Sequence, residues 1–214
     1  MERQHRLHPE APARPSHVQQ CLDGTDPVVW LDVLDLPLVY YMEASYAIEG
    51  QRQHVQPGRG DRAYTRGGVL PTPVFERSRK AYPLLRYPWA DARAALLALA
   101  QDRPDLDAMR ITYVNPETGA DAQNILGFYA LMLRPGQTLR LPARSPAMVL
   151  HQIEGGAEVK IEHTTFTLAE GDTCCAPGYT AVTLHNRSAE QPAFLFIADE
   201  SPLHHKLGVF ENRG

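Results

Sequence analysis

The stretch MVLHQIEGGAEVKIEHTTFTLAEGD, from Met148 to Asp172, decides the fold class. It opens with the apolar run Met148–Ile153, which ends at Glu154–Gly156, and it continues with the strictly alternating segment Glu158–Glu162. Strict alternation places successive side chains on opposite faces of a strand, and paired glycines mark turns. The stretch therefore predicts short strands joined by tight turns.

The same pattern extends in both directions, from Leu126 to Ile197. Further short apolar segments lie at regular spacing, and they are Gly127–Arg134, the segment opened by Gly171-Asp172, Ala181–Leu184 and Ala193–Ile197. Many short strands at this spacing are typical of a β-sandwich or barrel. We expect a mainly β fold without a repeat architecture.

One short helix is expected before these strands, over Ala90–Gln101. Asp91 lies in its first turn, where a carboxylate suits the helix dipole, and Leu96 and Leu99 share one face. The helix ends before Arg103-Pro104, because proline cannot continue it. We expect this helix to pack on a sheet.

The N-terminal part divides by composition. Residues 1–25 are polar and rich in His, Pro and Arg, which predicts a flexible arm. The β-branched and aromatic residues of Val28–Met42 predict a strand that Pro37 interrupts. Residues from about 49 to 73 are rich in glycine and predict a loop.

Composition excludes several classes of partner. The chain has 214 residues, a net charge of −4, and 43% hydrophobic against 21% charged residues, which is typical of a globular protein without a nucleic-acid partner. No apolar run approaches the ~18 residues of a membrane span, and the start lacks the pattern of a signal peptide. Cys21, Cys174 and Cys175 cannot form a disulfide framework. We expect a cytoplasmic protein with no membrane partner.

Motifs between Arg134 and Asn186 resemble those of a cupin domain, the small double-stranded β-helix of the jelly-roll class. The matching elements are Pro135-Gly136, Glu154–Gly156, Gly171-Asp172, Pro177-Gly178 and Asn186. A metal-binding cupin carries a His-x-His pair and a glutamate in its first motif and a third histidine in its second. The resemblance therefore implies ligand positions that can be located by spacing.

At those positions the chain has Pro142, Arg144, Met148 and Val182. These side chains offer no ligand set for a hard cation, so we predict that this C-terminal cupin binds no metal. His151 and His185 lie three residues beyond Met148 and Val182, which is the opposite face of an alternating strand. Arg144 could instead hold an aromatic carboxylate inside the barrel.

Four motifs lie outside the cupin, and they are Pro27–Val39, Leu84–Trp89, Tyr113–Gly119 and Leu207–Phe210. They resemble motifs of the gentisate 1,2-dioxygenase family, with its salicylate and 1-hydroxy-2-naphthoate dioxygenase relatives, and the resemblance covers roughly residues 12 to 212. It implies a bicupin that holds Fe(II) through three histidines of its first cupin. It also implies O2-dependent ring cleavage of a hydroxylated aromatic acid, with the second cupin supplying architecture and oligomer contacts.

The resemblance assigns two further positions. His17 matches the third iron histidine, and Asp32 in the segment Trp30–Asp32 matches an aspartate near the iron that orients substrate or handles protons. Only 16 residues precede His17, which at ~3.3 Å per strand residue is too short for the half-barrel that carries the other ligands. We therefore expect an incomplete iron site on an N-terminally truncated relative. Arg86 and Arg110 could pair with a carboxylate but are interpreted as surface salt-bridge residues.

The expected organisation has five parts. They are the arm 1–25, the end of a first cupin with a linker loop at 26–83, a helical connector at 84–125, the C-terminal cupin barrel at 126–200 and a tail at 201–214. A dimer or larger homo-oligomer is expected, because an orphaned half of a bicupin leaves an apolar face uncovered, for which Val28–Met42 is the candidate.

Three functions stay open. The first is a ring-cleaving dioxygenase whose first cupin is lost or supplied by another polypeptide. The second is a non-catalytic, metal-free cupin that keeps the fold and the oligomer interface. The third is a small-molecule module in which Arg144 holds an aromatic acid.

Overall fold

The computed structural model describes residues 31–44, 87–116 and 118–214. They belong to two compact units, Met1–Asp61 and Arg62–Gly214. Each unit is described by itself.

The described part of the first unit contains one short helix, α1 (Leu36–Tyr41). Pro37 lies in its first turn, where the missing N–H needs no partner and the fixed φ suits a helix. The strand predicted over Val28–Met42 is therefore wrong for Leu36–Tyr41, because Pro37 begins a helix instead of interrupting a strand. Residues 28–30 lie outside the described ranges.

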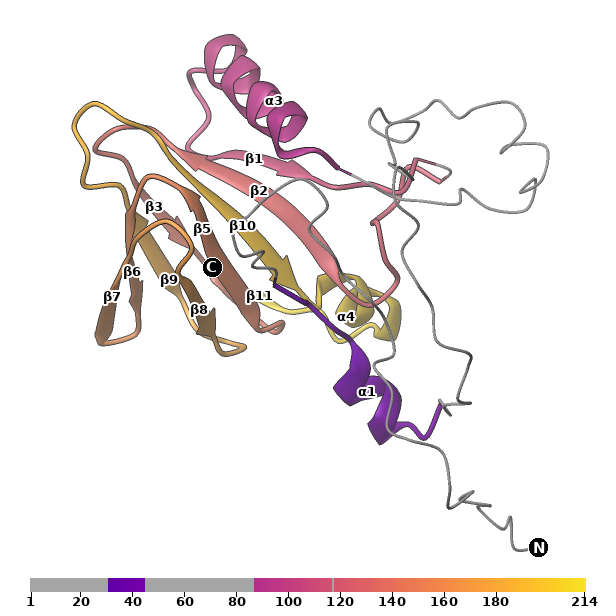
Figure 1. Cartoon of the computed structure of the whole chain (residues 1–214). Coiled ribbons are helices and arrows are strands. Elements are labelled where there is room, and N and C mark those ends of the chain that lie inside the picture. Colours follow the sequence, from indigo (N-terminus) through magenta and orange to yellow (C-terminus); the bar gives the residue numbers. More distant parts are fainter. Residues whose placement is uncertain (1–30, 45–86, 117) are drawn as a thin grey trace, which may run out of the picture. The chain divides into compact units, whose positions relative to one another are not determined.

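The second unit contains two antiparallel sheets that face each other as a sandwich (Figure 1). The larger sheet has, in order across it, β1 (Met109–Thr112), β2 (Gly127–Leu133), β10 (Ala193–Asp199), β5 (Met148–Glu154) and β8 (Thr173–Ala176). The smaller sheet has, in order, β3 (Thr138–Leu141), β9 (Val182–His185), β6 (Ala157–Ile161) and β7 (Thr164–Leu168). The prediction of a mainly β fold is confirmed.

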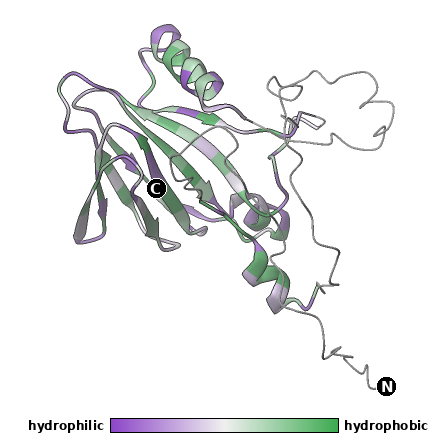
Figure 2. Ribbon diagram, in the orientation of Figure 1, coloured by the Kyte–Doolittle hydropathy of each residue, from purple (hydrophilic) through white to green (hydrophobic). Residues whose placement is uncertain are grey.

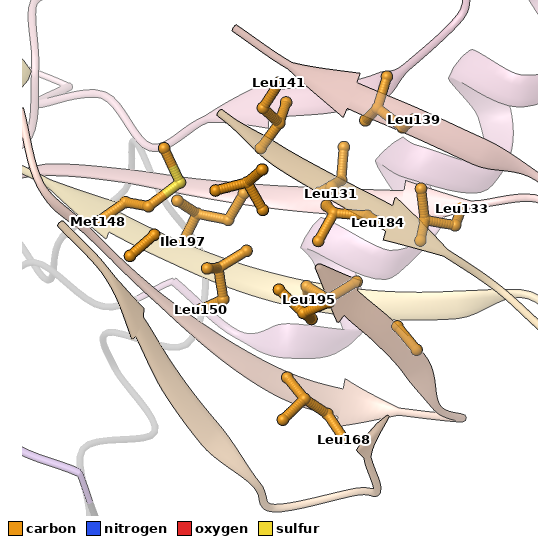
Figure 3. Packing of buried hydrophobic residues seen from close by; sticks show 14 of the residues in the cluster. Leu131, Leu133, Leu139, Leu141, Met148, Leu150, Leu168, Leu184, Leu195 and Ile197 are labelled. Atoms are coloured by element: carbon orange, nitrogen blue, oxygen red, sulfur yellow. The ribbon is translucent and has the colours of Figure 1, made fainter. Parts of the chain in front are cut away.

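The core fills the space between the two sheets (Figure 3). Leu131 and Leu195 reach it from the larger sheet and Val159 and Leu184 from the smaller one, all fully buried. Figure 2 shows hydrophobic colours along much of the strands of the sandwich and hydrophilic colours in several of its loops. Burial of alternate side chains from two inner faces is what holds a sandwich together.

Helix α3 (Trp89–Asp102) covers part of the outer face of the larger sheet. Leu96 is fully buried there, in a cluster with Met109 and Phe194. The helix predicted over Ala90–Gln101 is thus confirmed, and it packs on a sheet as expected. The connector that carries α3 also contains β1, which the sequence pattern did not predict and which extends the larger sheet.

The C-terminal segment returns to the sandwich. Helix α4 (Ser201–Leu207) ends at Gly208, whose φ of 70° is the left-handed conformation that glycine adopts readily. The following strand β11 (Asn212–Arg213) pairs with β4 (Ala143–Arg144). This pairing fixes the backbone that carries Arg144. In the described ranges no helix is long and apolar enough to cross a membrane.

Candidate functional site

Charged side chains gather at one end of the otherwise apolar interior. The alternation along β10 places Asp199 on the same face as Ile197, which belongs to the core. The strand register pairs Asp199 with Gly127 of β2, and Arg110 of β1 with the core residue Leu131. We call this group the mouth cluster, and its members are Arg110, Tyr129, Arg144, Asp199 and Ser201.

A buried ion pair forms the centre of the mouth cluster. Nη2 of Arg144 donates to Oδ2 of Asp199 over 3.1 Å, with side chains that are 12% and 0% exposed. The other carboxylate oxygen, Oδ1, accepts from the hydroxyl of Tyr129 at 3.3 Å and from the backbone N–H of Ser201 at 2.9 Å. A buried carboxylate is stable only with such partners, and Asp199 has them on both oxygens.

The second guanidinium has no such partner. The Cζ atom of Arg110 lies 3.9 Å from the centre of the Tyr129 ring. Burial, and then the positive charge of Arg144, lower the pKa of Arg110, and Tyr129 and Asp199 partly offset this. Within the described ranges no ion pair joins Arg110 to a carboxylate. Arg110 is half-buried, not at the surface as the sequence led us to expect, and Arg86 lies outside the described residues.

Gly127 makes room for the phenol of Tyr129. A Cβ atom on Gly127 would lie 2.5 Å from the Tyr129 hydroxyl and 3.2 Å from Oδ1 of Asp199. Burial and the nearby charge of Asp199 raise the pKa of Tyr129, so the phenol keeps its proton and donates it. Oγ of Ser201 is buried, near enough to affect the pKa of Tyr129, yet without a hydrogen bond of normal geometry.

The residues at the cupin ligand positions do not fit an iron ion. Met148 and Val182 lie in the apolar core, and Pro142 has no donor atom in its side chain. The remaining position, Arg144, is a cation that already binds Asp199. In the parts of the chain that the structure describes, no group of three or more His, Cys, Asp or Glu side chains could hold a metal.

The predicted orientation of two histidines is confirmed. Along β5 and β9 the buried residues alternate with half-buried ones, and His151 and His185 are among the latter. Their Nδ1 atoms lie 2.9 Å from the hydroxyls of Thr173 and Thr138, respectively. Neither histidine reaches the mouth cluster's face of its strand.

Two of the residues singled out from the sequence, Arg144 and Arg110, lie in the mouth cluster. Asp32 is an exposed residue of the first unit, and His17 lies outside the described residues. Sequence reasoning missed Tyr129 and Asp199. The available signal was the charge of Asp199, directly after the apolar run from Ala193 to Ala198.

Together, two antiparallel sheets around an apolar interior, with a polar mouth at one end, define a cupin. The fold is shared with the salicylate 1,2-dioxygenase from Pseudaminobacter salicylatoxidans, at a TM-score of 0.67 and 24% identity over 84% of this chain and 53% of that one. No family model matches the chain.

Comparison with curated sequences indicates which group of cupins the chain is similar to. The chain is 74% identical to a gentisate 1,2-dioxygenase from Ralstonia sp over 192 residues, which are 90% of this chain and 54% of the relative. It is 29% identical to a 1-hydroxy-2-naphthoate 1,2-dioxygenase from Nocardioides sp. (strain KP7), over 87% of this chain and 49% of the relative. The chain is thus similar in sequence to gentisate 1,2-dioxygenases over most of its length, and it spans about half the length of the curated relatives it matches.

Proposed function

We propose that the chain is part of a gentisate 1,2-dioxygenase-type enzyme, which cleaves the ring of a hydroxylated aromatic acid with Fe(II) and O2. The observation that supports this is the 74% identity to the Ralstonia enzyme over 90% of the chain. Since the match spans 54% of that relative, the activity is assigned to a whole enzyme of which this chain is one portion.

The proposal assigns a structural role to one cupin and iron binding to another. The described cupin supplies architecture, because Met148, Val182 and Arg144 stand where a metal-binding cupin has its ligands. Iron is assigned to a first cupin, with His17 as one of its ligands and Asp32 close to the substrate. Iron supplies the O2 chemistry there, and the resemblance, not the geometry, supports these two residues.

The division is tested with iron analysis and O2 uptake on gentisate. We expect the 214-residue chain alone, reconstituted with Fe(II), to retain less than one iron and to consume no O2. Co-expression with the N-terminal half of the Ralstonia relative is expected to restore both, and His17→Ala is expected to remove them again. Stoichiometric iron with turnover by the chain alone would contradict the division.

A second candidate function is a non-catalytic, metal-free cupin that binds an aromatic carboxylate. The mouth cluster favours it, because it holds two guanidiniums and one carboxylate. Arg144 was the residue that the sequence suggested for this role. Its ion pair with Asp199 means that a ligand would have to share or displace that carboxylate.

A further inference from the structure

We propose that two copies of this chain pair through strand β7, edge to edge, across a two-fold axis at Phe166. The partner is a second copy of the chain, and the contact forms one sheet that runs through both copies. This inference goes beyond the proposed function and does not depend on where the whole enzyme holds iron. It also concerns a different part of the chain from Val28–Met42, for which the sequence predicts an oligomer contact.

Strand β7 lies at an open edge of the smaller sheet. Among the described strands it pairs with β6 alone, and Figure 1 shows it at the margin of the sandwich. The residues from Thr164 to Thr167 are all exposed. An edge strand presents backbone N–H and C=O groups that have no partner in the sheet, and another strand can pair with them. β7 is therefore open to a further strand.

The edge at β7 lacks the charge that commonly protects an edge strand from pairing. Strands β1 and β3, which form two other edges of the sandwich, carry Arg110 and Arg140. β7 has no charged side chain. β8, at the fourth edge, is also uncharged but has only small side chains. Only at β7 does an uncharged edge coincide with a large apolar side chain.

That side chain is Phe166, which a second copy would cover. Phe166 is 41% exposed, and no other large apolar side chain in the described strands is exposed. Its cross-strand partner Val159 is fully buried in the core, so Phe166 lies on the inner face of the smaller sheet, at its open margin. A two-fold axis at Phe166 places a second phenyl ring beside the first, and their contact removes apolar area of both rings from water.

The register of the β6–β7 hairpin determines which backbone groups of β7 are available. Ile161 pairs with Thr164 across the two-residue turn Glu162–His163. A hairpin turn of this length closes on a pair of residues that exchange hydrogen bonds. Because such pairs alternate along antiparallel strands, the N–H and C=O groups of Thr165 and Thr167 point away from β6.

The available groups are complementary to themselves. An axis at Phe166 places Thr165 of one copy opposite Thr167 of the other, so the outward N–H and C=O groups of both residues find partners in both copies. An axis at Thr165 or at Thr167 would leave one of these two residues without a partner from the opposite strand. Two-fold dimers are the commonest homo-oligomers, and this edge meets their requirement that one surface match itself.

The experiment is sedimentation velocity of the full chain with two variants of one position. Thr165→Pro removes the N–H that points away from β6, and proline is tolerated in an edge strand at such a position. We expect Thr165→Pro to halve the mass of the wild-type species, whether that species is a dimer or larger. Thr165→Val keeps the N–H and should leave the mass unchanged. A monomeric wild type, an unchanged mass for Thr165→Pro, or an equal loss in Thr165→Val would overturn the proposal.

A cross-link tests the position of the axis without the use of proline. Opposite residues of a non-hydrogen-bonded pair have Cα atoms ~4.5 Å apart, a separation that a disulfide can span. In a background where Cys21, Cys174 and Cys175 are replaced by alanine, Phe166→Cys should form a disulfide-linked dimer under mild oxidation. Lys160→Cys, on the exposed outer face of β6, should not. No dimer of Phe166→Cys, or equal cross-linking of Lys160→Cys, would overturn the two-fold contact.

Discussion

Asp199 places a fully buried negative charge at the end of an apolar strand, and its removal leaves Arg144 without a carboxylate. Breaking a buried ion pair from one side is strongly destabilising, so Asp199→Asn should lower the free energy of unfolding by about 3–5 kcal/mol. Urea denaturation measures this. The matched control is Glu158→Gln, which removes the partner of the exposed Arg187 and should cost less than about 1 kcal/mol. Equal losses would mean that the buried pair contributes no more than a surface pair.

We predict that a side chain at position 127 destabilises the protein, because Gly127 lies against the hydroxyl of Tyr129. In Gly127→Ala the new Cβ would collide with the Tyr129 hydroxyl, and overpacking of this kind costs about 1–3 kcal/mol. Tyr129→Phe removes that hydroxyl, so Gly127→Ala should cost less in the Tyr129→Phe background. A double-mutant cycle on the free energy of unfolding measures the coupling. If the two substitutions lowered the free energy of unfolding additively, contact with the Tyr129 hydroxyl would not be the reason for glycine at position 127.

The adjacent cysteines should differ in reactivity. The two thiols lie on opposite sides of β8, since Cys174 packs against the core and Cys175 is exposed. Burial, followed by the neighbouring Cys175, raises the pKa of Cys174 to about 11. Because the thiolate is the nucleophile, iodoacetamide near neutral pH should alkylate Cys174 at least about 10-fold more slowly than Cys175. Rates measured in Cys174→Ala and Cys175→Ala test this, and equal rates would contradict it.

At the residue scale, counting along cupin motifs predicted part of the mouth cluster and could not predict the rest. Spacing located Arg144 because it lies within a motif. Arg110, Tyr129 and Asp199 come from β1, β2 and β10, which strand order brings side by side although they are distant in sequence. Local pattern does not specify strand order, so the partners of Arg144 could be found only in the folded chain.

At the scale of elements, the carboxylate of Glu154 in β5 accepts two hydrogen bonds from helix α3. Oε1 of Glu154 accepts from the indole of Trp89 at 2.6 Å, and Oε2 accepts from Nε of Arg93 at 2.8 Å. The bond from Arg93 is the main reason why the pKa of Glu154 is lowered from 4.5. A lowered pKa in the folded state stabilises the protein above the unfolded pKa, and this contribution is lost as the pH falls through the folded pKa.

The stability that Glu154 contributes should therefore disappear in acid. The difference in unfolding free energy between wild type and Glu154→Gln should shrink from about pH 6 to about pH 3, since protonated Glu and Gln are alike in charge. Denaturation curves at several pH values measure it. Glu162→Gln, in an exposed turn, is the control and should show a smaller change. If the difference in unfolding free energy between wild type and Glu154→Gln did not change with pH, the ion pair with Arg93 would not be the source of this stability.

Elements with a complete local signal were predicted well. The strands from β5 to β10 have alternating or apolar runs bounded by glycine, and α3 has one apolar face. In α1 the same β-branched and aromatic residues that favour a strand form a single helical turn after Pro37. No residue of α1 is buried, so among the described residues 31–44 no packing partner corrects the misleading composition.

At the scale of the whole molecule, the first described segment carries six large apolar side chains that are exposed. These side chains are Leu31, Leu34, Leu36, Tyr40, Tyr41 and Met42, and Tyr41 is 89% exposed. Scattered exposed apolar residues are ordinary, but a contiguous run of them marks an interaction site. The expectation of a dimer or larger homo-oligomer is therefore retained as a proposal, with a helix and its preceding residues in place of the predicted strand.

Sedimentation velocity of the full chain tests the proposed homo-oligomer. Wild type should sediment as a dimer or larger species, and the double variant Leu34→Asp/Tyr41→Asp should sediment as a smaller one, because a charge in an apolar interface is desolvated without a partner. The control is Val209→Asp, which places a charge at an apolar residue of the second unit that is 50% exposed, and it should leave the distribution unchanged. A monomeric wild type, or an equal shift in Val209→Asp, would contradict assembly through this segment.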